Sequence, residues 1–334
     1  MTGPPAAVAA VRSAVRKALA GIEPRPGPVQ PGSGTPRRAL VLVACSGGPD
    51  SAALAAAVAF EAPRSECRAG LVTVDHGLQP GSADQAERVA KWAAGLGLDP
   101  VEVATVAVGS AGGPEAAART ARYAALEQAA GRHGAAAVLL AHTLDDQAET
   151  VLLALARGSG ARTLSGMPER RGIFVRPLLG IRREVTRAAC AAEDLPTWDD
   201  PHNTDPAYSR SRVRALLPAL EEATGGGAVA GLARSARLLR ADAELLDALA
   251  AELADVVTGA DGSLDAAALA ATAPALRTRV LHGWALSLGA PAGALGASHV
   301  DALDALVTGW KGQGPTNLPG GVTVVRTAGR LRRA

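Results

Sequence analysis

Residues 39–51, ALVLVACSGGPDS, join an apolar run to a turn rich in serine and glycine, and the apolar run AALAAAVAF follows at once. This order predicts a buried strand, a tight turn and the beginning of a helix. Gly47 and Gly48 let the backbone turn with its N–H groups outward, and the positive end of the helix adds to them, which makes an anion site. Ser46 and Ser51 contribute hydroxyl donors. The turn has neither the lysine and spacing of a Walker A loop nor the G-x-G-x-x-G pattern.

Three more apolar stretches alternate with helical patterns after this turn. Strands are predicted at 69–75, 101–108 and 135–141, and helices at 82–96 and 114–131. A short strand before residues 176–179 and helices at 182–193 and 208–217 follow. Strands that alternate with helices indicate an α/β fold with a doubly wound parallel sheet.

The chain divides into three parts by composition. Residues 1–38 hold an amphipathic helix at 4–20 and a connector rich in proline and glycine at 24–36. Residues 39–217 form the predicted α/β domain. Residues 218–334 are predicted to form a smaller, mainly helical domain, with a long helix at 231–257 and two short strands between 318 and 333.

Composition narrows the class of protein. The 334 residues are 48% hydrophobic but only 2% aromatic, and the formal net charge is +2. The three cysteines, Cys45, Cys67 and Cys190, are scattered and form no C-x-x-C pair. We expect a cytoplasmic protein that does not enter a membrane, because no signal peptide pattern or membrane-length apolar run occurs.

Polar residues follow the second and fourth predicted strands. Asp75 and His76 come after the second strand, and His142 comes after the fourth. Ligands in parallel sheets bind beyond the carboxyl ends of the strands, so these side chains are expected near the glycine turn if the strands are neighbours. A histidine in a loop with ordinary hydrogen bonds is the alternative for His76.

An acidic group opens the helix after the fourth strand. Asp145 and Asp146 are adjacent, and Glu149 lies three residues after Asp146, on the same helical face. Helix capping explains one such carboxylate. The rest favour a site for Mg²⁺ or for a cationic substrate.

Arginines gather in three places. Arg119 and Arg122 share one helical face, as do Arg210 and Arg214. Residues 157–187 hold eight arginines, Arg157 and Arg176 among them, against two glutamates. A solvated charged face is the simple explanation of one pair, but the local excess is typical of a surface that binds a polyanion.

The motifs together resemble one family. The segment 46–51, SGGPDS, resembles the SGGxDS loop of the PP-loop ATP pyrophosphatases. Six further motifs follow in order: VDHGLQ at 74–79, ARTARY at 118–123, AHTLDDQAET at 141–150, RGSG at 157–160, RPLL at 176–179 and the block from Trp198 through Tyr208 to Arg214. In this order they resemble the tRNA(Ile)-lysidine synthetases over residues 39–217. The helical remainder resembles the C-terminal part of the shorter members.

The resemblance implies a reaction. Such an enzyme uses ATP to adenylate the wobble cytidine of an isoleucine tRNA with a CAU anticodon, and releases pyrophosphate. Free L-lysine then attacks the activated carbon through its ε-amine and expels AMP. The product, lysidine, converts decoding from AUG to AUA.

The resemblance also implies residue roles. The implied catalytic residues are Asp50, Arg119, Arg122, Asp146 and Glu149, with Asp50 contacting Mg²⁺. The implied ATP-binding residues are Ser46, Gly47, Gly48, Pro49, Asp50, Ser51, Asp75, His76 and His142. Lysine and the RNA are assigned to Asp145, Asp146, Glu149, Arg157, Arg176, Arg210 and Arg214. Ser211 stands where members usually have asparagine, which leaves one hydrogen bond of that block open.

Other functions remain as alternatives. A tRNA thiolation enzyme shares the ATP loop, although the iron–sulfur kind needs grouped cysteines. A non-catalytic ATP- or RNA-binding protein is a second alternative, and the retained Asp50, Arg122, Asp146 and Glu149 argue against it. A PP-loop amidotransferase would leave the arginine stretch unexplained. A homodimer is left open.

Overall fold

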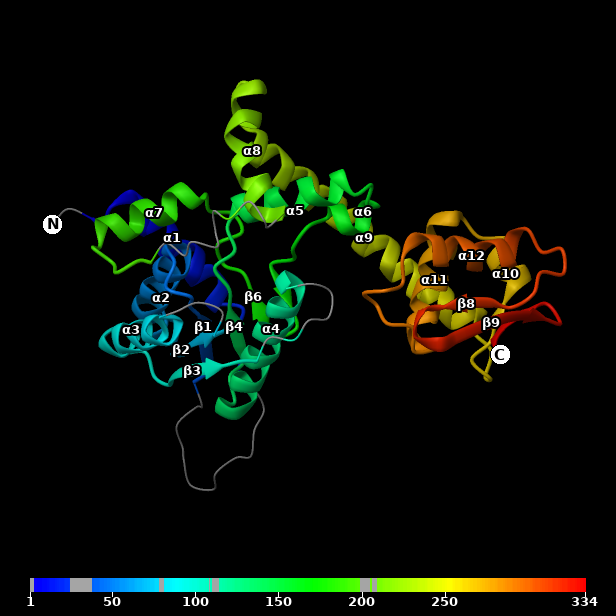
Figure 1. Ribbon diagram of the computed structural model, residues 1–334, viewed down its shortest axis with the longest axis horizontal. Coiled ribbons are helices and arrows are strands. Elements are labelled where there is room, and N and C mark those ends of the chain that lie inside the picture. The colour runs from blue at the N-terminus through cyan, green and yellow to red at the C-terminus, as the bar shows by residue number, and fades with distance from the viewer. Residues whose placement is uncertain are drawn as a thin grey trace. The chain divides into compact units, whose positions relative to one another are not determined.

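The computed structural model describes residues 3–24, 38–77, 81–107, 109, 114–198, 205 and 209–334. Most of the predicted connector, the end of the second motif and Tyr208 lie outside these residues. The chain forms two compact units, residues 1–237 and 238–334 (Figure 1). Each is described by itself.

The first unit is built on a six-stranded sheet with the order β3-β2-β1-β4-β6-β5. The strands are β1 Leu40–Ala44, β2 Arg68–Asp75, β3 Val101–Thr105, β4 Ala137–Leu139, β5 Arg170–Arg171 and β6 Phe174–Val175. All neighbours pair in parallel except β5, which is antiparallel to β6. The predicted α/β class with a mostly parallel sheet is confirmed.

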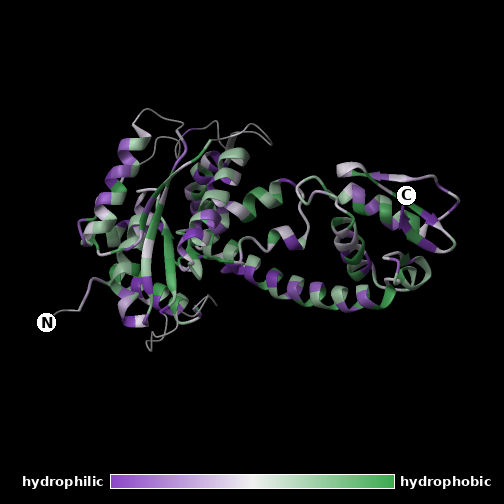
Figure 2. Ribbon diagram, turned by 90° about the horizontal axis from the view of Figure 1, so that it is seen from below, coloured by the Kyte–Doolittle hydropathy of each residue, from purple (hydrophilic) through white to green (hydrophobic). Residues whose placement is uncertain are grey.

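Helices cover both faces of this sheet. The helices of this unit are α1 Ala6–Leu19, α2 Pro49–Glu61, α3 Ser82–Gly95, α4 Pro114–His133, α5 Leu144–Ala156, α6 Ala161–Leu164, α7 Arg183–Ala192 and α8 Ser209–Ala223. The helices α1, α2, α3 and α7 share an apolar cluster with one face of the sheet, α4 shares one with the other face, and α8 packs on α5. In β1, Val41 and Val43 belong to the apolar cluster with α1, α2 and α7, while Leu40 and Leu42 belong to the cluster with α4. Both sides of β1 are therefore buried, which is why its sequence is apolar throughout. Figure 2 shows hydrophobic strands at the centre of this unit.

The strand order creates a switch point beside β1. The chain moves from β1 to β2 and β3 on one side, and then crosses to β4 on the other side of β1. The loops that leave β1 and β4 therefore diverge, which opens a crevice at their carboxyl ends. The glycine turn follows β1, and the acidic group follows β4.

The second unit combines helices with a small sheet. The long helix α9, Ala228–Val257, begins in the first unit and ends in the second, where α10 Ala266–Ala270, α11 Pro274–Ser287 and α12 Ala297–Thr308 follow. The four strands β7 Leu264–Asp265, β8 Thr316–Leu318, β9 Val322–Thr327 and β10 Arg330–Arg333 lie in the order β7-β10-β9-β8. The structure adds β7 and β8 to the two predicted strands. No helix among the described residues has the length and apolarity needed to cross a bilayer.

Candidate active site

The glycine turn connects β1 to α2 in the predicted way. Gly47 has φ of +85°, a conformation that favours glycine, and a Cβ there would lie 2.7 Å from the amide nitrogen of Gln85. Gly48 caps α2, and Pro49 is its first residue. The Ser51 hydroxyl donates to the Gly48 carbonyl at 2.9 Å and accepts from the Ser46 N–H at 3.2 Å. The loop is thus closed by its own hydroxyl groups, with the positive end of α2 at its centre.

The first turn of α7 contacts the loop. The Thr186 hydroxyl donates to Asp50 Oδ1, and Arg183 Nε lies 3.6 Å from Asp50 Oδ2. Burial raises the pKa of the Asp50 carboxyl above its ordinary value, and the hydrogen bond from Thr186 opposes that rise. Asp50 is therefore a largely buried carboxylate at the glycine turn whose charge is only partly compensated.

The acids of α5 are paired with arginines. Asp146 Oδ1 accepts from Arg183 Nη2 at 2.7 Å, and Glu149 Oε1 accepts from the same Nη2 at 3.0 Å. Arg214 holds both oxygens of Glu149, with its Nε 2.9 Å from Oε1 and its Nη2 3.3 Å from Oε2. The two carboxylates and the two guanidiniums thus form one continuous network.

Asp146 also caps its helix. Its Oδ2 accepts from the N–H and the hydroxyl of Thr143, both at 2.7 Å. Burial disfavours the charge of Asp146, but Arg183 and the hydrogen bonds from Thr143 outweigh it and lower the pKa. The capping alternative is therefore correct for one oxygen of Asp146, while the other faces Arg183.

Asp145 points elsewhere. Its Oδ2 accepts from the backbone N–H of Arg183 at 2.8 Å and from Arg182 Nε at 3.2 Å. Successive helical residues point about 100° apart, so adjacent aspartates take different partners. Asp145 thus ties the beginning of α7 to α5.

A cationic cluster lies around Tyr123. Its hydroxyl accepts from Arg119 Nη2 at 3.1 Å and from Arg176 Nη2 at 3.4 Å. Arg122 lies over the same ring, 5.9 Å from its centroid. Among the residues that the structure describes, no ion pair joins Arg119, Arg122 or Arg176 to a carboxylate. Burial lowers the pKa of Arg119 and of Arg122, and Arg210 lowers both further by repulsion. The cluster is therefore suited to an anion.

His142 is buried next to this cluster. Burial lowers its pKa from 6.5 to about 3, and Arg176, Arg122 and Arg119 add to that effect while Asp146 opposes it. Its Nδ1 is buried with no hydrogen-bond partner in the described part of the chain. The imidazole is neutral at physiological pH and offers an unused polar atom.

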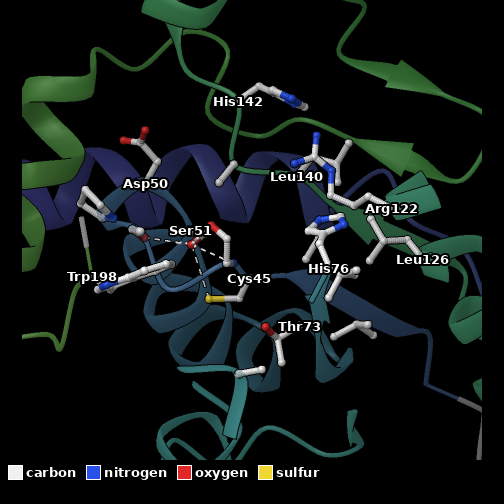
Figure 3. Close-up of a pocket in the computed structure, with 18 of the residues that line it drawn as sticks. Cys45, Asp50, Ser51, Thr73, His76, Arg122, Leu126, Leu140, His142 and Trp198 are labelled. Carbon is white, nitrogen blue, oxygen red and sulfur yellow. Dashed lines mark hydrogen bonds between the residues drawn. The ribbon is translucent and has the colours of Figure 1, made fainter. Parts of the chain in front are cut away.

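These groups meet in a cavity of about 630 Å³. The predicted site residues that line it are Ser46, Gly48, Pro49, Asp50, Ser51, Asp75, His76, Arg122, His142, Asp146 and Arg214. In Figure 3, Asp50 and Trp198 lie on one side of the drawn site, and His76 and Arg122 lie on the other. The volume is in the range of ligand pockets, which is roughly 300–1,000 Å³.

The remaining predicted residues lie outside the lining of this cavity. They are Gly47, Arg119, Asp145, Glu149, Arg157, Arg176 and Arg210. Glu149 and Arg119 act on lining residues through the contacts given above. Arg176 is only 4% exposed and donates to the Pro168 carbonyl at 2.9 Å, whereas Arg157 is exposed at the end of α5.

Arg183, Gln85 and Trp198 are among the other residues of the cavity lining. The sequence analysis counted Arg183 among the arginines of residues 157–187 and did not single it out. No motif indicated Gln85 as a site residue. Trp198 was part of the last motif, and its backbone N–H donates to the Gly47 carbonyl at 2.9 Å. The chain after α7 is thereby attached to the glycine turn.

Comparison with known proteins agrees with this geometry. Residues 29–220 match the family model of the PP-loop domain, and residues 264–332 match that of the TilS substrate binding domain. The chain is 58% identical to the tRNA(Ile)-lysidine synthase of Salinispora tropica, over 97% of this chain and 95% of that protein. It is 56% identical to the tRNA(Ile)-lysidine synthase of Streptomyces coelicolor, over 98% of each.

A solved structure shares the fold. The U34-tRNA thiolase NcsA from Methanococcus maripaludis, with its [4Fe-4S] cluster, matches with a TM-score of 0.54 and 18% sequence identity. The match covers 70% of this chain and 80% of that one. At this identity the likeness concerns the fold alone. The family models and the high identity over nearly full length show that this chain belongs to the tRNA(Ile)-lysidine synthase family of PP-loop ATP-dependent ligases.

Proposed function

We propose that the chain joins free lysine to the wobble cytidine of a CAU-anticodon isoleucine tRNA at the expense of ATP, and so forms lysidine. The observation that carries the proposal is the meeting of three groups at the switch point of one sheet. These are the glycine turn, the arginine cluster and the paired acids of α5. Relatives that this chain matches over 95–98% of their length are named for this activity.

The glycine turn is assigned to the pyrophosphate of ATP. The N-terminus of α2, which Gly48 caps, provides positive charge without a lysine. Adenylation turns the 2-carbonyl oxygen of cytidine into a good leaving group, and a fixed anion site stabilises the pyrophosphate as it departs.

The arginine cluster is assigned to the α-phosphate. Arg122 reaches the cavity itself, and Arg119 and Arg176 hold Tyr123 beside it. Their positive charges are buried without a carboxylate among the described residues, so a phosphoryl group would relieve their repulsion. Neutral His142 offers a hydrogen bond there without competing for the anion.

The paired acids are assigned to lysine. An ammonium group needs carboxylate oxygens. Asp146 lines the cavity, and Glu149 is joined to it through Arg183. The attacking ε-amine must be neutral, so one of these carboxylates receives its proton. Asp145, which the sequence assigned to the substrate, acts in this proposal by holding α7.

Mg²⁺ fits the loop through Asp50. Magnesium in nucleotide sites is commonly held by one or two carboxylates and the phosphates, and Asp50 is a buried carboxylate that lacks full compensation. When bound, the ion would neutralise charge on the phosphates.

The RNA is assigned to exposed arginines and to the second unit. Arg157 and the other exposed arginines of the 157–187 stretch suit contacts to phosphates, while Arg176, Arg210 and Arg214 lie with the cavity groups. The second unit, expected as residues 218–334 and compact over 238–334, is proposed to bind tRNA or to form a dimer. A cytoplasmic location stays a prediction.

The thiolation alternative is less well supported. Its fold-level match is 18% identical, against 50–59% for relatives named as lysidine synthases. Cys45 lines the cavity and Cys190 Sγ donates to the Pro49 carbonyl at 3.2 Å, but burial raises the pKa of both thiols. A sulfur-transfer site needs a reactive thiolate, which these buried thiols do not favour.

AMP release tests the proposal. Purified protein is incubated with ATP, with and without lysine and a CAU-anticodon isoleucine tRNA transcript, and the digested RNA is analysed by mass. We expect AMP that requires both partners and a lysine-sized addition on one cytidine. AMP that needs the RNA but not lysine would indicate another RNA-modifying activity, and ATP binding without AMP would indicate a binding protein.

A further inference from the structure

The guanidinium of Arg183 bridges the two parts of the proposed site. Its Nε lies 3.6 Å from Asp50 on the glycine turn, and its Nη2 lies 2.7 Å from Asp146 and 3.0 Å from Glu149 on α5. The side chain is 16% exposed and lines the cavity. One cation is thus shared between the nucleotide loop and the acids assigned to lysine, an assignment that rests on the proposed function.

Arg183 occupies the position that a substrate cation needs. Lysine's ammonium would bind to Asp146 Oδ1 and Glu149 Oε1, and both atoms already accept from Arg183. Arg183 and Arg214 already share Glu149 Oε1, so a third cation on these oxygen atoms would be repelled strongly at a partly buried site. Lysine therefore binds there only when one arginine withdraws.

Arg183 is better placed to withdraw than Arg214. Arg214 holds both oxygens of Glu149 in a two-point contact that fixes its orientation, and its Nη2 lies 3.6 Å from Asp146 Oδ1. Arg183 reaches one oxygen of each acid, and its Nε already faces the glycine turn. An arginine forms strong, two-point contacts with phosphate oxygens. Phosphates bound at the turn would therefore attract this side chain away from α5.

We propose that Arg183 is a positioning residue that couples the two small substrates. In the ligand-free chain it fills the cation position beside Asp146 and Glu149. Phosphate groups at the glycine turn draw its guanidinium toward Asp50 and open that position. Lysine then binds after the nucleotide, which keeps the acids of α5 neutralised until an activated base is available.

Lysine binding measured with and without nucleotide tests the coupling. Calorimetry on the full chain uses lysine alone and lysine with Mg²⁺ and a non-hydrolysable ATP analogue. For the natural chain we expect tighter lysine binding with the analogue, by a factor in the range of about 5–150 that is typical of coupled sites. For Arg183→Ala we expect a factor near one, because lysine affinity without the analogue rises.

Arg182→Ala is the matched control. Arg182 is the adjacent arginine, but it pairs with Asp145 and Glu221 and is absent from the cavity lining. This variant should retain the coupling factor of the natural chain. If Arg183→Ala does not fold by circular dichroism, Arg183→Gln removes the charge and keeps a polar contact, with the same expected factor near one.

Two results would overturn the coupling. One is equal lysine affinity with and without the analogue in a natural chain that forms lysidine. The other is a folded Arg183→Ala that no longer binds lysine, because Arg183 would then be part of the lysine site. Failure to form lysidine at all would instead refute the proposed function.

Discussion

The charge of Glu149 is the most direct residue-level test of the lysine assignment. Its carboxylate is almost fully buried and holds Arg183 and Arg214. Glu149→Gln keeps the shape and removes the charge. Since a hydrogen bond to a charged group contributes about 1.5–3 kcal/mol, we expect kcat/KM for lysine to fall by roughly 10- to 100-fold, with the KM for ATP little changed.

Glu193→Gln is the control for this substitution. Glu193 also pairs with an arginine, Arg12, but it lies outside the cavity lining. It should leave the kinetics for lysine unaltered. Unchanged KM and kcat for lysine in Glu149→Gln would remove Glu149 from the proposed lysine site.

The stability of the protein should fall at acid pH because burial keeps His142 neutral in the folded chain. Its pKa in the folded chain is about 3, against 6.5 when exposed, so the unfolded chain binds more protons between these values. Stability from this group is present above pH 6.5 and is lost as the pH falls toward 3. We expect the Tm of the natural chain to fall more steeply between pH 6.5 and 4.5 than the Tm of His142→Gln.

The difference in the fall of Tm with pH between the natural chain and His142→Gln reports the protonation of His142 and not that of other groups. Both proteins carry the same carboxylates, Asp146 included, so their acid titration contributes to both curves. Parallel curves would show that His142 is protonated with an ordinary pKa in the folded chain.

The sequence indicated which residue types gather at the candidate site, but not the direction in which each side chain points. SGGPDS located the turn between β1 and α2 because local backbone chemistry determines it. Arg183 could not be singled out, because eight arginines occur between 157 and 187 and only the packing of α7 on α2 turns this one inward. For the same reason the sequence assigned Asp145 to the substrate, whereas its carboxylate holds the first N–H of α7.

At the scale of elements, Gln147 connects α5 to the segment before β5. Its side-chain amide donates to the Met167 carbonyl at 3.0 Å and accepts from the Met167 N–H at 2.8 Å. Gln147→Leu would leave two buried backbone groups without partners. At about 1–3 kcal/mol for each group, we expect a loss of roughly 2–4 kcal/mol in the free energy of unfolding, measured with urea.

Gln128→Leu is the matched control for Gln147→Leu. Gln128 is exposed on α4, and surface substitutions usually change stability by less than about 0.5 kcal/mol. Equal effects of the two substitutions would mean that the amide of Gln147 does not support α5.

Elements were predictable where a pattern runs through enough residues. The expected helices at 82–96 and 182–193 agree closely with α3 and α7, because their apolar spacing is local. Strands β5 and β7 have two residues each, too few to show alternation, and are defined only by pairing with β6 and β10.

At the scale of the whole molecule, the candidate active site and the second compact unit are separate parts of the chain. The cavity is lined entirely by residues of the first unit among those described. The second unit has its own core, around Leu281 and Leu303, and a buried ion pair between Arg277 and Asp304. Its fold therefore does not depend on the cavity, and its proposed role is to bind the large substrate.

Salt dependence should show whether the second unit contacts RNA phosphates. Lys311 and Arg333 are exposed there, and each phosphate contact adds roughly 0.7–0.9 to the slope of log affinity against log salt concentration. We expect Lys311→Ala/Arg333→Ala to weaken tRNA binding and to reduce that slope by about 1–2, with unchanged ATP affinity. Lys17→Ala/Lys91→Ala, which removes two exposed charges from α1 and α3, should leave the slope unaltered. A reduced slope in that control, with none in the second-unit variant, would assign the RNA to the first unit and leave dimerisation as the role of residues 238–334.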